Sequence, residues 1–165
     1  MSIHSPIETN GKSGVMADYL DSLSLVERLH RLLLDVIKDE FERLGVIELN
    51  AVQALLLFNI GENEVTAGEL KTRGYYQGSN VSYNLKKLVE KGYMHHQRCE
   101  IDRRSVRVRL TRQGRDVRDI VAGLFERHAD GMVARGVVTG DSLKDIADAL
   151  KRMERYWTDQ IRYIY

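Results

Sequence analysis

Cationic side chains are concentrated in one stretch of this chain, residues 66–115, and phosphate binding is the chemistry that they suit. The stretch has twelve Lys and Arg against four Asp and Glu, a charge of +8, whereas the remaining residues carry −7 and the whole chain +1. The closely spaced phosphates of duplex DNA attract such a surface, and a charge asymmetry of this size concerns partners rather than fold. We therefore predict that this stretch binds double-stranded DNA.

A helix small enough to enter the major groove is predicted at about residues 79–91. Val81, Leu85 and Leu88 share one face at helical spacing, and Gly92 ends the pattern. Recognition helices insert their N-terminal residues deepest, so the other face supplies the DNA contacts. The candidates for base edges are Gln77, Ser79, Asn80, Ser82 and Tyr83, and those for phosphates are Lys86 and Lys87.

A β-hairpin follows this helix, with strands predicted at residues 93–99 and 105–110. Val106, Val108 and Leu110 alternate with polar and cationic residues, which is typical of a strand with one solvated face. A basic loop at its turn can reach a narrow minor groove, where the negative potential favours guanidinium groups. Arg103 and Arg104 are the candidates, and Asp102 either orients one of them or simply makes the turn.

Other helices must position the 79–91 helix and the hairpin against DNA. A short helix capped by Thr66 and Glu69 precedes the 79–91 helix, so the two predict a helix-turn-helix. Upstream, residues 16–44 have the pattern of a long amphipathic helix, and the apolar run within 48–60 that of a core helix. Downstream, helices are predicted at 111–135 and 141–163. The fold class is therefore mainly α with a small β-hairpin wing: a winged helix-turn-helix domain plus a helical dimerisation region.

The last helix has more apolar surface than a terminal helix on a small domain needs. Its seam is close to a heptad pattern and consists of Leu143, Ile146, Leu150, Met153, Trp157 and Ile164. Contact with a second copy in a homodimer explains the seam best, and packing against the first helix is the alternative. The domains expected are a flexible arm at 1–14, a dimerisation region at 15–47 and 111–165, and a DNA-binding domain at 48–110.

Several other functions are not expected. His95, His96, Cys99 and Glu100 are zinc-ligand types, but adjacent strand residues point to opposite faces, so neither a metal nor a cofactor is predicted. No nucleophile motif or phosphate-cradling loop is present, which argues against an enzyme. The first residues lack a secretory pattern, and no apolar run is long enough for a membrane helix, so we expect a cytoplasmic protein without a membrane partner. The remaining alternative is a winged-helix interaction module that docks an acidic partner.

The run DRRSVRVRLTRQG at residues 102–114 resembles the wing signature of the MarR family of winged-helix regulators. Asp102 and Arg104 stand at its D-x-R positions, and Leu110, Thr111 and Gly114 at its L-T-x-x-G positions. The preceding run SNVSYNLKKLVEKGY is similar to that family's recognition helix and first wing strand. With the order of the other helices, the resemblance covers about residues 16–163.

This resemblance implies a bacterial homodimeric transcription regulator on a pseudo-palindromic operator, with the first and last helices at the dimer interface. It implies that Arg104 enters the minor groove and that Asp102 orients it. It also implies a small aromatic or lipophilic effector, bound between the dimer region and the DNA-binding lobes, which would relieve repression. Redox-sensing members place their cysteine in the first helix, whereas Cys99 lies in the wing, so thiol sensing is not expected.

Overall fold

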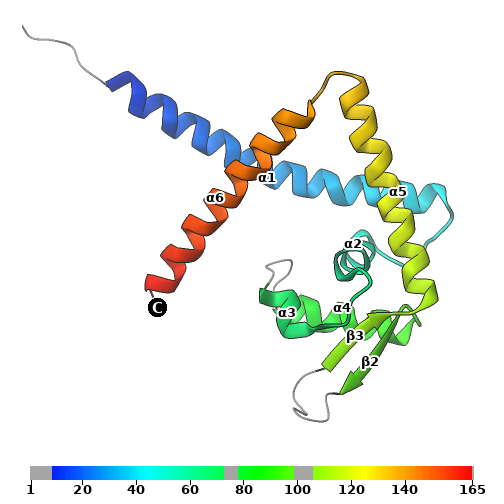
Figure 1. Ribbon diagram of the computed structural model, residues 1–165. Coiled ribbons are helices and arrows are strands. Elements are labelled where there is room, and N and C mark those ends of the chain that lie inside the picture. The colour runs from blue at the N-terminus through cyan, green and yellow to red at the C-terminus, as the bar shows by residue number, and fades with distance from the viewer. Residues whose placement is uncertain (1–8, 73–77, 99–105, 165) are drawn as a thin grey trace, which may run out of the picture. The chain divides into compact units, whose positions relative to one another are not determined.

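The computed structural model describes residues 9–72, 78–98 and 106–164, and the side chains of residues 14–66, 68–70, 80–98 and 107–162. The elements in chain order are α1 (Thr9–Arg43), α2 (Ala51–Ile60), β1 (Val65–Thr66), α3 (Ala67–Thr72), α4 (Gly78–Glu90), β2 (Met94–Arg98), β3 (Val106–Leu110), α5 (Arg112–Ala134) and α6 (Gly140–Ile164) (Figure 1). The chain divides into two compact units, residues 1–121 and 122–165. The predicted mainly α fold with a small winged sheet is confirmed.

Side-chain caps set where the helices of the first unit begin. At α2, Asn50 Oδ1 accepts from the Gln53 amide at 2.8 Å, while Gln53 Oε1 accepts from the Asn50 amide at 3.4 Å. At α3, Thr66 Oγ1 accepts from the Glu69 amide at 3.1 Å, and the Glu69 carboxylate accepts from the Thr66 amide at 3.3 Å. Both are capping boxes, which satisfy amides that have no partner within the helix. The predicted box at Thr66 and Glu69 is confirmed.

The end of α4 directs the chain into the wing. Gly92 has a φ of 83°, a conformation that residues with a Cβ rarely adopt. The turn that it makes lets the Tyr93 amide donate to the Leu88 carbonyl at 2.9 Å, and the Tyr93 carbonyl then accepts from the Thr111 amide at 3.1 Å. One buried residue, Tyr93, thus joins the end of α4 to the start of α5.

The sheet has three strands in the order β1-β3-β2, all antiparallel. The hairpin pairs Met94 with Leu110 and His96 with Val108, as the predicted alternation requires. Strand β1 was not predicted: it pairs Val65 with Val108 and so covers the other edge of β3. Two residues are too few to show a periodicity, so only the pairing itself reveals this strand.

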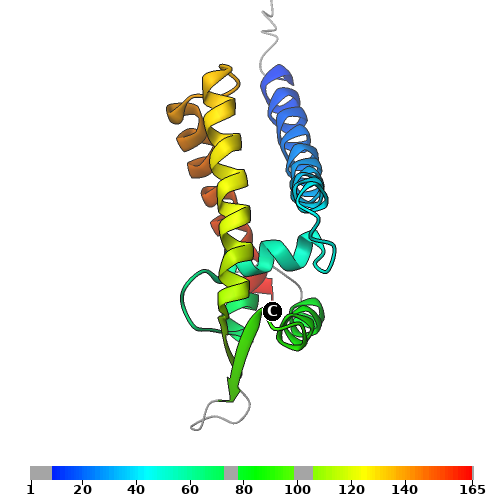
Figure 2. The same ribbon diagram turned by 90° about the vertical axis from the view of Figure 1, so that its right-hand side faces the viewer.

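The core of the first unit lies where α2 meets α1 and the sheet. Helix α2 contacts both α1 and β3, and Figure 2 shows it running between the end of α1 and α4. The large side chains with less than 2% exposure are Ile37, Leu56, Leu57, Leu70, Leu88, Val65, Val81, Val108 and Val121. They come from almost every element of the unit, so the position of α4 is fixed by a common core.

The first helix is longer than predicted. It begins at Thr9 rather than near Met16, so part of the segment that was expected to be a flexible arm is helical. Gly11 and Gly14 cost helix stability, about 1 kcal/mol each, but they remove no backbone donor and need not end a long helix. Residues 1–8 lie outside the described residues.

Apolar side chains are exposed along two helices. In α1 they are Val15, Met16, Tyr19, Leu20, Leu25, Val26, Leu29 and Leu32, and in α6 they are Leu143, Ile146, Leu150, Tyr156, Trp157 and Ile161. The α6 set includes four members of the predicted seam. Single protomers rarely expose so many large apolar side chains on one helix.

Candidate nucleic-acid interface

Helix α4 presents a polar face because its apolar face is anchored in the core. Val81 and Leu88 are fully buried and Leu85 is 7% exposed, whereas Asn80 and Lys86 on the other side are exposed. The two faces predicted from helical spacing are therefore confirmed. Only the polar face is available to a partner.

A tyrosine and two lysines dominate this polar face. Tyr83 is 60% exposed, and Lys87 Nζ lies 5.8 Å from the centre of its ring, a cation–π distance. Lys87 Nζ is also 3.5 Å from Glu90 Oε2, whereas Lys86 makes no ion pair within the described residues. Lys87 is thus oriented by two neighbours, and Lys86 projects an unneutralised charge.

Some predicted site residues cannot be placed. Gln77, Asp102, Arg103 and Arg104 lie outside the described residues, as does Cys99, and the side chain of Ser79 is not among those described. Ser82 is exposed on α4, beside Lys86. The structure therefore brings Asn80, Ser82, Tyr83, Lys86 and Lys87 onto one helix surface, and the roles of the others stay predictions.

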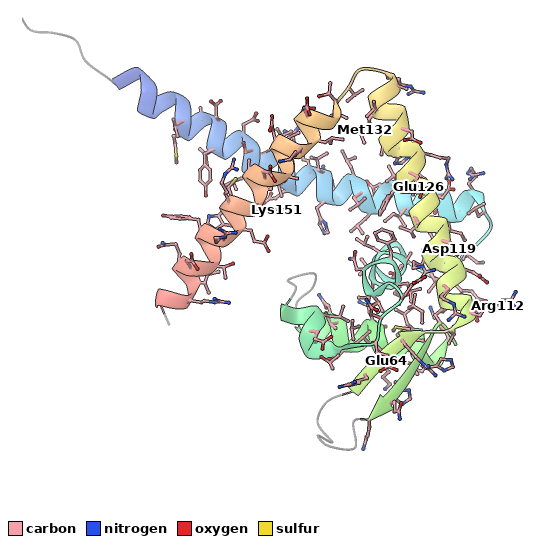
Figure 3. The ribbon with its side chains drawn as sticks, viewed as in Figure 1. Glu64, Arg112, Asp119, Glu126, Met132 and Lys151 are labelled. Atoms are coloured by element: carbon pink, nitrogen blue, oxygen red, sulfur yellow. The ribbon has the colours of Figure 1, made fainter. Side chains whose placement is uncertain are left out.

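The wing sheet has two different faces. Val108 and Leu110 are buried, while Arg107 and Arg109 point to the other side, where Gln97 and His95 are their cross-strand partners. Arg107 lies 3.9 Å from the Glu64 carboxylate, which is labelled in Figure 3. The expected basic outer face is confirmed. Because His95 pairs with Arg109 and His96 with Val108, the two histidines lie on opposite faces, and no metal-binding cluster occurs among the described residues.

A buried polar contact that the sequence did not predict holds α4 in place. Gln53 Nε2 donates to Asn84 Oδ1 at 3.3 Å, and Asn84 Nδ2 donates to the Asn80 backbone carbonyl at 2.9 Å. Both side chains are buried. Gln53 also completes the capping box of α2 with Asn50, so this contact ties the start of α2 to the middle of α4. In the sequence, the one sign of this contact is Asn84, a polar residue on the apolar side of α4.

Two hollows flank α4. One, of about 660 Å³, is bordered by Lys38 and Phe41 of α1, by the start of α2, and by Tyr83 and Lys87 of α4. The other, of about 440 Å³, lies between α4 and the sheet and is lined by Ser82, Leu85, Lys86, Val89, Glu90, His96 and Val108. Both volumes are within the range of small-molecule sites. Each hollow includes at least one residue of the polar face.

The junction at which α4, the wing and α5 meet, the wing root, contains the buried residue Tyr93. Burial raises the pKa of Tyr93 above its ordinary value, and the negative charge of Glu48 raises it further, while a hydrogen bond from Gln113 lowers it. Tyr93 is 3% exposed and stays protonated near neutral pH. It acts as a structural residue between α4 and α5 rather than as a titrating one.

Comparison with known proteins agrees with this geometry. Residues 49–114 match the family described as a winged helix DNA-binding domain. The exopolysaccharide II synthesis transcriptional activator ExpG of Rhizobium meliloti (strain 1021) is 33% identical over 165 residues, which cover 98% of this chain and 82% of ExpG. The solved structure of the transcriptional regulator SlyA has a TM-score of 0.71 at 21% identity, covering 88% of this chain and 99% of that one.

A MarR-family regulator from Listeria monocytogenes, solved with a 26mer DNA, also has a TM-score of 0.71 at 20% identity, covering 86% of this chain and 92% of that one. This chain belongs to the MarR family of winged-helix transcriptional regulators. The resemblance noted in the wing is confirmed, and a family of regulators agrees with the prediction that the chain is not an enzyme. Among the described helices none is both long and apolar enough to span a membrane.

The MarR signature L-T-x-x-G has a structural role in this chain. Leu110 is buried, and Thr111 Oγ1 donates to the Gly92 carbonyl at 2.8 Å while it accepts from the Gly114 amide at 3.1 Å. Gly114 packs so closely on the Tyr93 carbonyl that a Cβ there would overlap it. The signature therefore joins the end of α4, the wing and α5 at one point.

Proposed function

We propose that this MarR-family chain is a homodimeric, sequence-specific transcription regulator that binds a pseudo-palindromic operator in duplex DNA. Asn80, Ser82 and Tyr83, with Gln77 and Ser79, would contact base edges, and Lys86 and Lys87 would contact phosphates. Arg103 and Arg104 would reach the minor groove, with Asp102 as the residue that orients an arginine. The observation that carries the proposal is the exposed, cationic face of α4 opposite its buried anchors.

A second copy of the chain is the partner that the exposed apolar faces of α1 and α6 fit. These faces are long and regular, and burying them against the same faces of a second copy would remove the apolar area from water. A dimer presents two copies of α4, which reach successive major grooves when they are separated by about one DNA turn, roughly 34 Å. Dimerisation therefore supplies the spacing that a pseudo-palindrome requires.

We further propose that a small aromatic or lipophilic effector binds in the 660 Å³ hollow beside α4. Tyr83 and Lys87 line this hollow and also belong to the DNA-contacting face, so one side chain cannot serve a ligand and a phosphate at once. Release of a preformed protein–DNA complex during titration with aromatic carboxylates would support the effector. Lack of release at any concentration would contradict it.

The direction of regulation depends on where the operator lies relative to the promoter. The prediction of a repressor rests on simple occupation of a promoter until an effector changes the dimer. The relative ExpG is described as an activator. A reporter assay, with the operator placed either over a promoter or upstream of it, distinguishes repression from activation. Repression in the first position with no effect in the second would support the repressor.

One experiment separates this function from its rival, the docking of an acidic protein partner. Genomic fragments are selected on the purified protein and sequenced, and binding of the enriched fragment is measured across a salt series. Several phosphate contacts make log affinity fall steeply with log salt. Failure to enrich any DNA sequence, together with a flat salt response, would favour the interaction module.

A further inference from the structure

A second cationic hollow lies away from α4, at the root of the wing. It has a volume of about 420 Å³ and is lined by Gly61, Glu62, His95, Arg109, Leu110, Thr111, Arg112 and Arg115. Figure 3 labels Arg112 at the first turn of α5, where β3 leads into that helix. None of the side chains lining it was assigned to the DNA-contacting face of α4, so this hollow needs a separate explanation.

The arginines of this hollow are unneutralised. Arg109, Arg112 and Arg115 are exposed and make no ion pair within the part of the chain that the structure describes. The acidic residue of the hollow, Glu62, is already engaged by Arg118 at 3.3 Å. Arg115 is oriented by a hydrogen bond from its Nη1 to the Leu110 carbonyl at 3.4 Å. Three guanidinium groups therefore border one concavity, and the carboxylate in its lining, that of Glu62, is paired with Arg118.

The position of two of these arginines is electrostatically unfavourable. Helix α5 has 23 residues, and its first turn contains no acidic residue but does contain Arg112 and Arg115. The N-terminal end of a helix carries a partial positive charge that favours anions and repels nearby cations. A sequence that breaks a local rule in this way commonly does so at a functional site. A bound anion would remove the repulsion.

We propose that this hollow is a phosphate-binding site, distinct from the DNA-contacting face of α4. Guanidinium forks match phosphate oxygens bidentately, and the hollow is large enough for a phosphorylated small molecule. The same chemistry is offered by a backbone phosphate of DNA that flanks the operator. In either case Arg109 and Arg112 hold the phosphate oxygens, and Arg115 adds charge from the next turn of the helix.

Calorimetric titration with inorganic phosphate and with pyrophosphate, at constant ionic strength and without DNA, tests the site directly. We expect saturable binding that Arg109→Gln and Arg112→Gln each weaken about tenfold or more, because a hydrogen bond to a charged group is worth about 1.5–3 kcal/mol. The matched controls are Lys151→Gln and Arg152→Gln on α6, both exposed cations outside the hollow. Equal weakening in all four variants would mean that net charge alone governs binding, which would overturn the site.

Two duplexes with the same selected sequence, one with and one without about ten additional base pairs on each side, identify the source of the phosphate. If the source is flanking DNA, Arg109→Gln lowers the salt slope by about one unit per phosphate contact only on the longer duplex. If the source is a small molecule, pyrophosphate binds and the two duplexes behave alike. Absence of both saturable anion binding and a flank effect would overturn the proposal. The anion titration needs no operator, so its result is independent of the proposed function.

Discussion

Gln53 and Asn84 form a buried hydrogen bond of 3.3 Å between side chains that are 31 residues apart. The bond joins the capped start of α2 to the middle of α4, so the helix that we propose to read DNA is held by a polar contact as well as by its apolar face. If either side chain were removed, the other would remain buried without this hydrogen bond, which would lower the free energy of unfolding.

Replacement of Asn84 by alanine should therefore lower the free energy of unfolding by about 1–3 kcal/mol. The measurement is urea unfolding followed by circular dichroism. Asn80→Ala is the control, because Asn80 is exposed one turn earlier on the same helix and should change stability by less than about 0.5 kcal/mol. Equal stabilities for the two variants would show that the Gln53 contact contributes nothing.

Gly114→Ala should destabilise the wing root. A Cβ at this position would overlap the Tyr93 carbonyl oxygen, which is backbone and cannot rotate away. Gly131→Ala is the matched control in the same helix, since nothing lies within 4 Å of its Cβ position. Alanine should stabilise α5 there by up to about 1 kcal/mol, because glycine is a poor helix former. Thermal unfolding of both variants should thus shift in opposite directions.

Arg104→Ala should strongly weaken binding to the selected operator while it leaves the fold intact. The reason is that a guanidinium group in a narrow minor groove is held by the negative potential there. Affinity is measured by fluorescence anisotropy, and circular dichroism checks the fold. Arg152→Ala, in α6, is the control for a simple loss of positive charge. Unchanged affinity in Arg104→Ala would remove the wing from the proposed DNA contacts.

Lys86→Ala and Lys87→Ala should each reduce affinity about equally for all DNA sequences and lower the salt slope by about one unit per half-site. Lys87 forms an ion pair with Glu90 and a cation–π contact with Tyr83, so Lys87→Ala should reduce affinity less than Lys86→Ala does. Lys144→Ala, whose side chain is paired with Asp148 on α6, should leave the slope unchanged. A larger effect at Lys144 than at Lys86 would contradict the proposed contacts of α4.

Leu150→Asp should shift the protein from dimer to monomer in sedimentation velocity experiments and abolish tight operator binding. A charge introduced into the apolar face of α6 would be buried without a partner in the dimer. Lys151→Ala is the control, because Lys151 is exposed one residue further along the same helix, and it should leave the dimer intact. A wild-type protein that sediments as a monomer would refute the homodimer outright.

Helical and strand periodicity was enough to predict most of the fold. The spacing of Val81, Leu85 and Leu88 correctly separated the buried face of α4 from its polar face, and the alternation of Val108 and Leu110 with arginines correctly oriented the wing. Local caps were also readable, as the Thr66–Glu69 box shows. These features depend on residues that are close in sequence, so short-range pattern is sufficient.

Features that join distant segments could not be predicted in this way. Strand β1 exists only because Val65 and Thr66 meet β3, and the bond between Gln53 and Asn84 exists only because α2 and α4 pack together. The three arginines at the wing root, which make no ion pair with any described residue, are likewise ordinary surface charges in the sequence. Only the hollow that Gly61 and His95 complete shows that they border one space.

The sequence by itself determined the charge asymmetry, the amphipathic helices and the wing signature, because each is written in residues within a few positions of one another. Tertiary structure decided which polar side chains are buried, which of the described cations form ion pairs and which of them share a concavity. Those properties depend on distances between elements, and such distances follow from the packing of the whole core rather than from any local pattern.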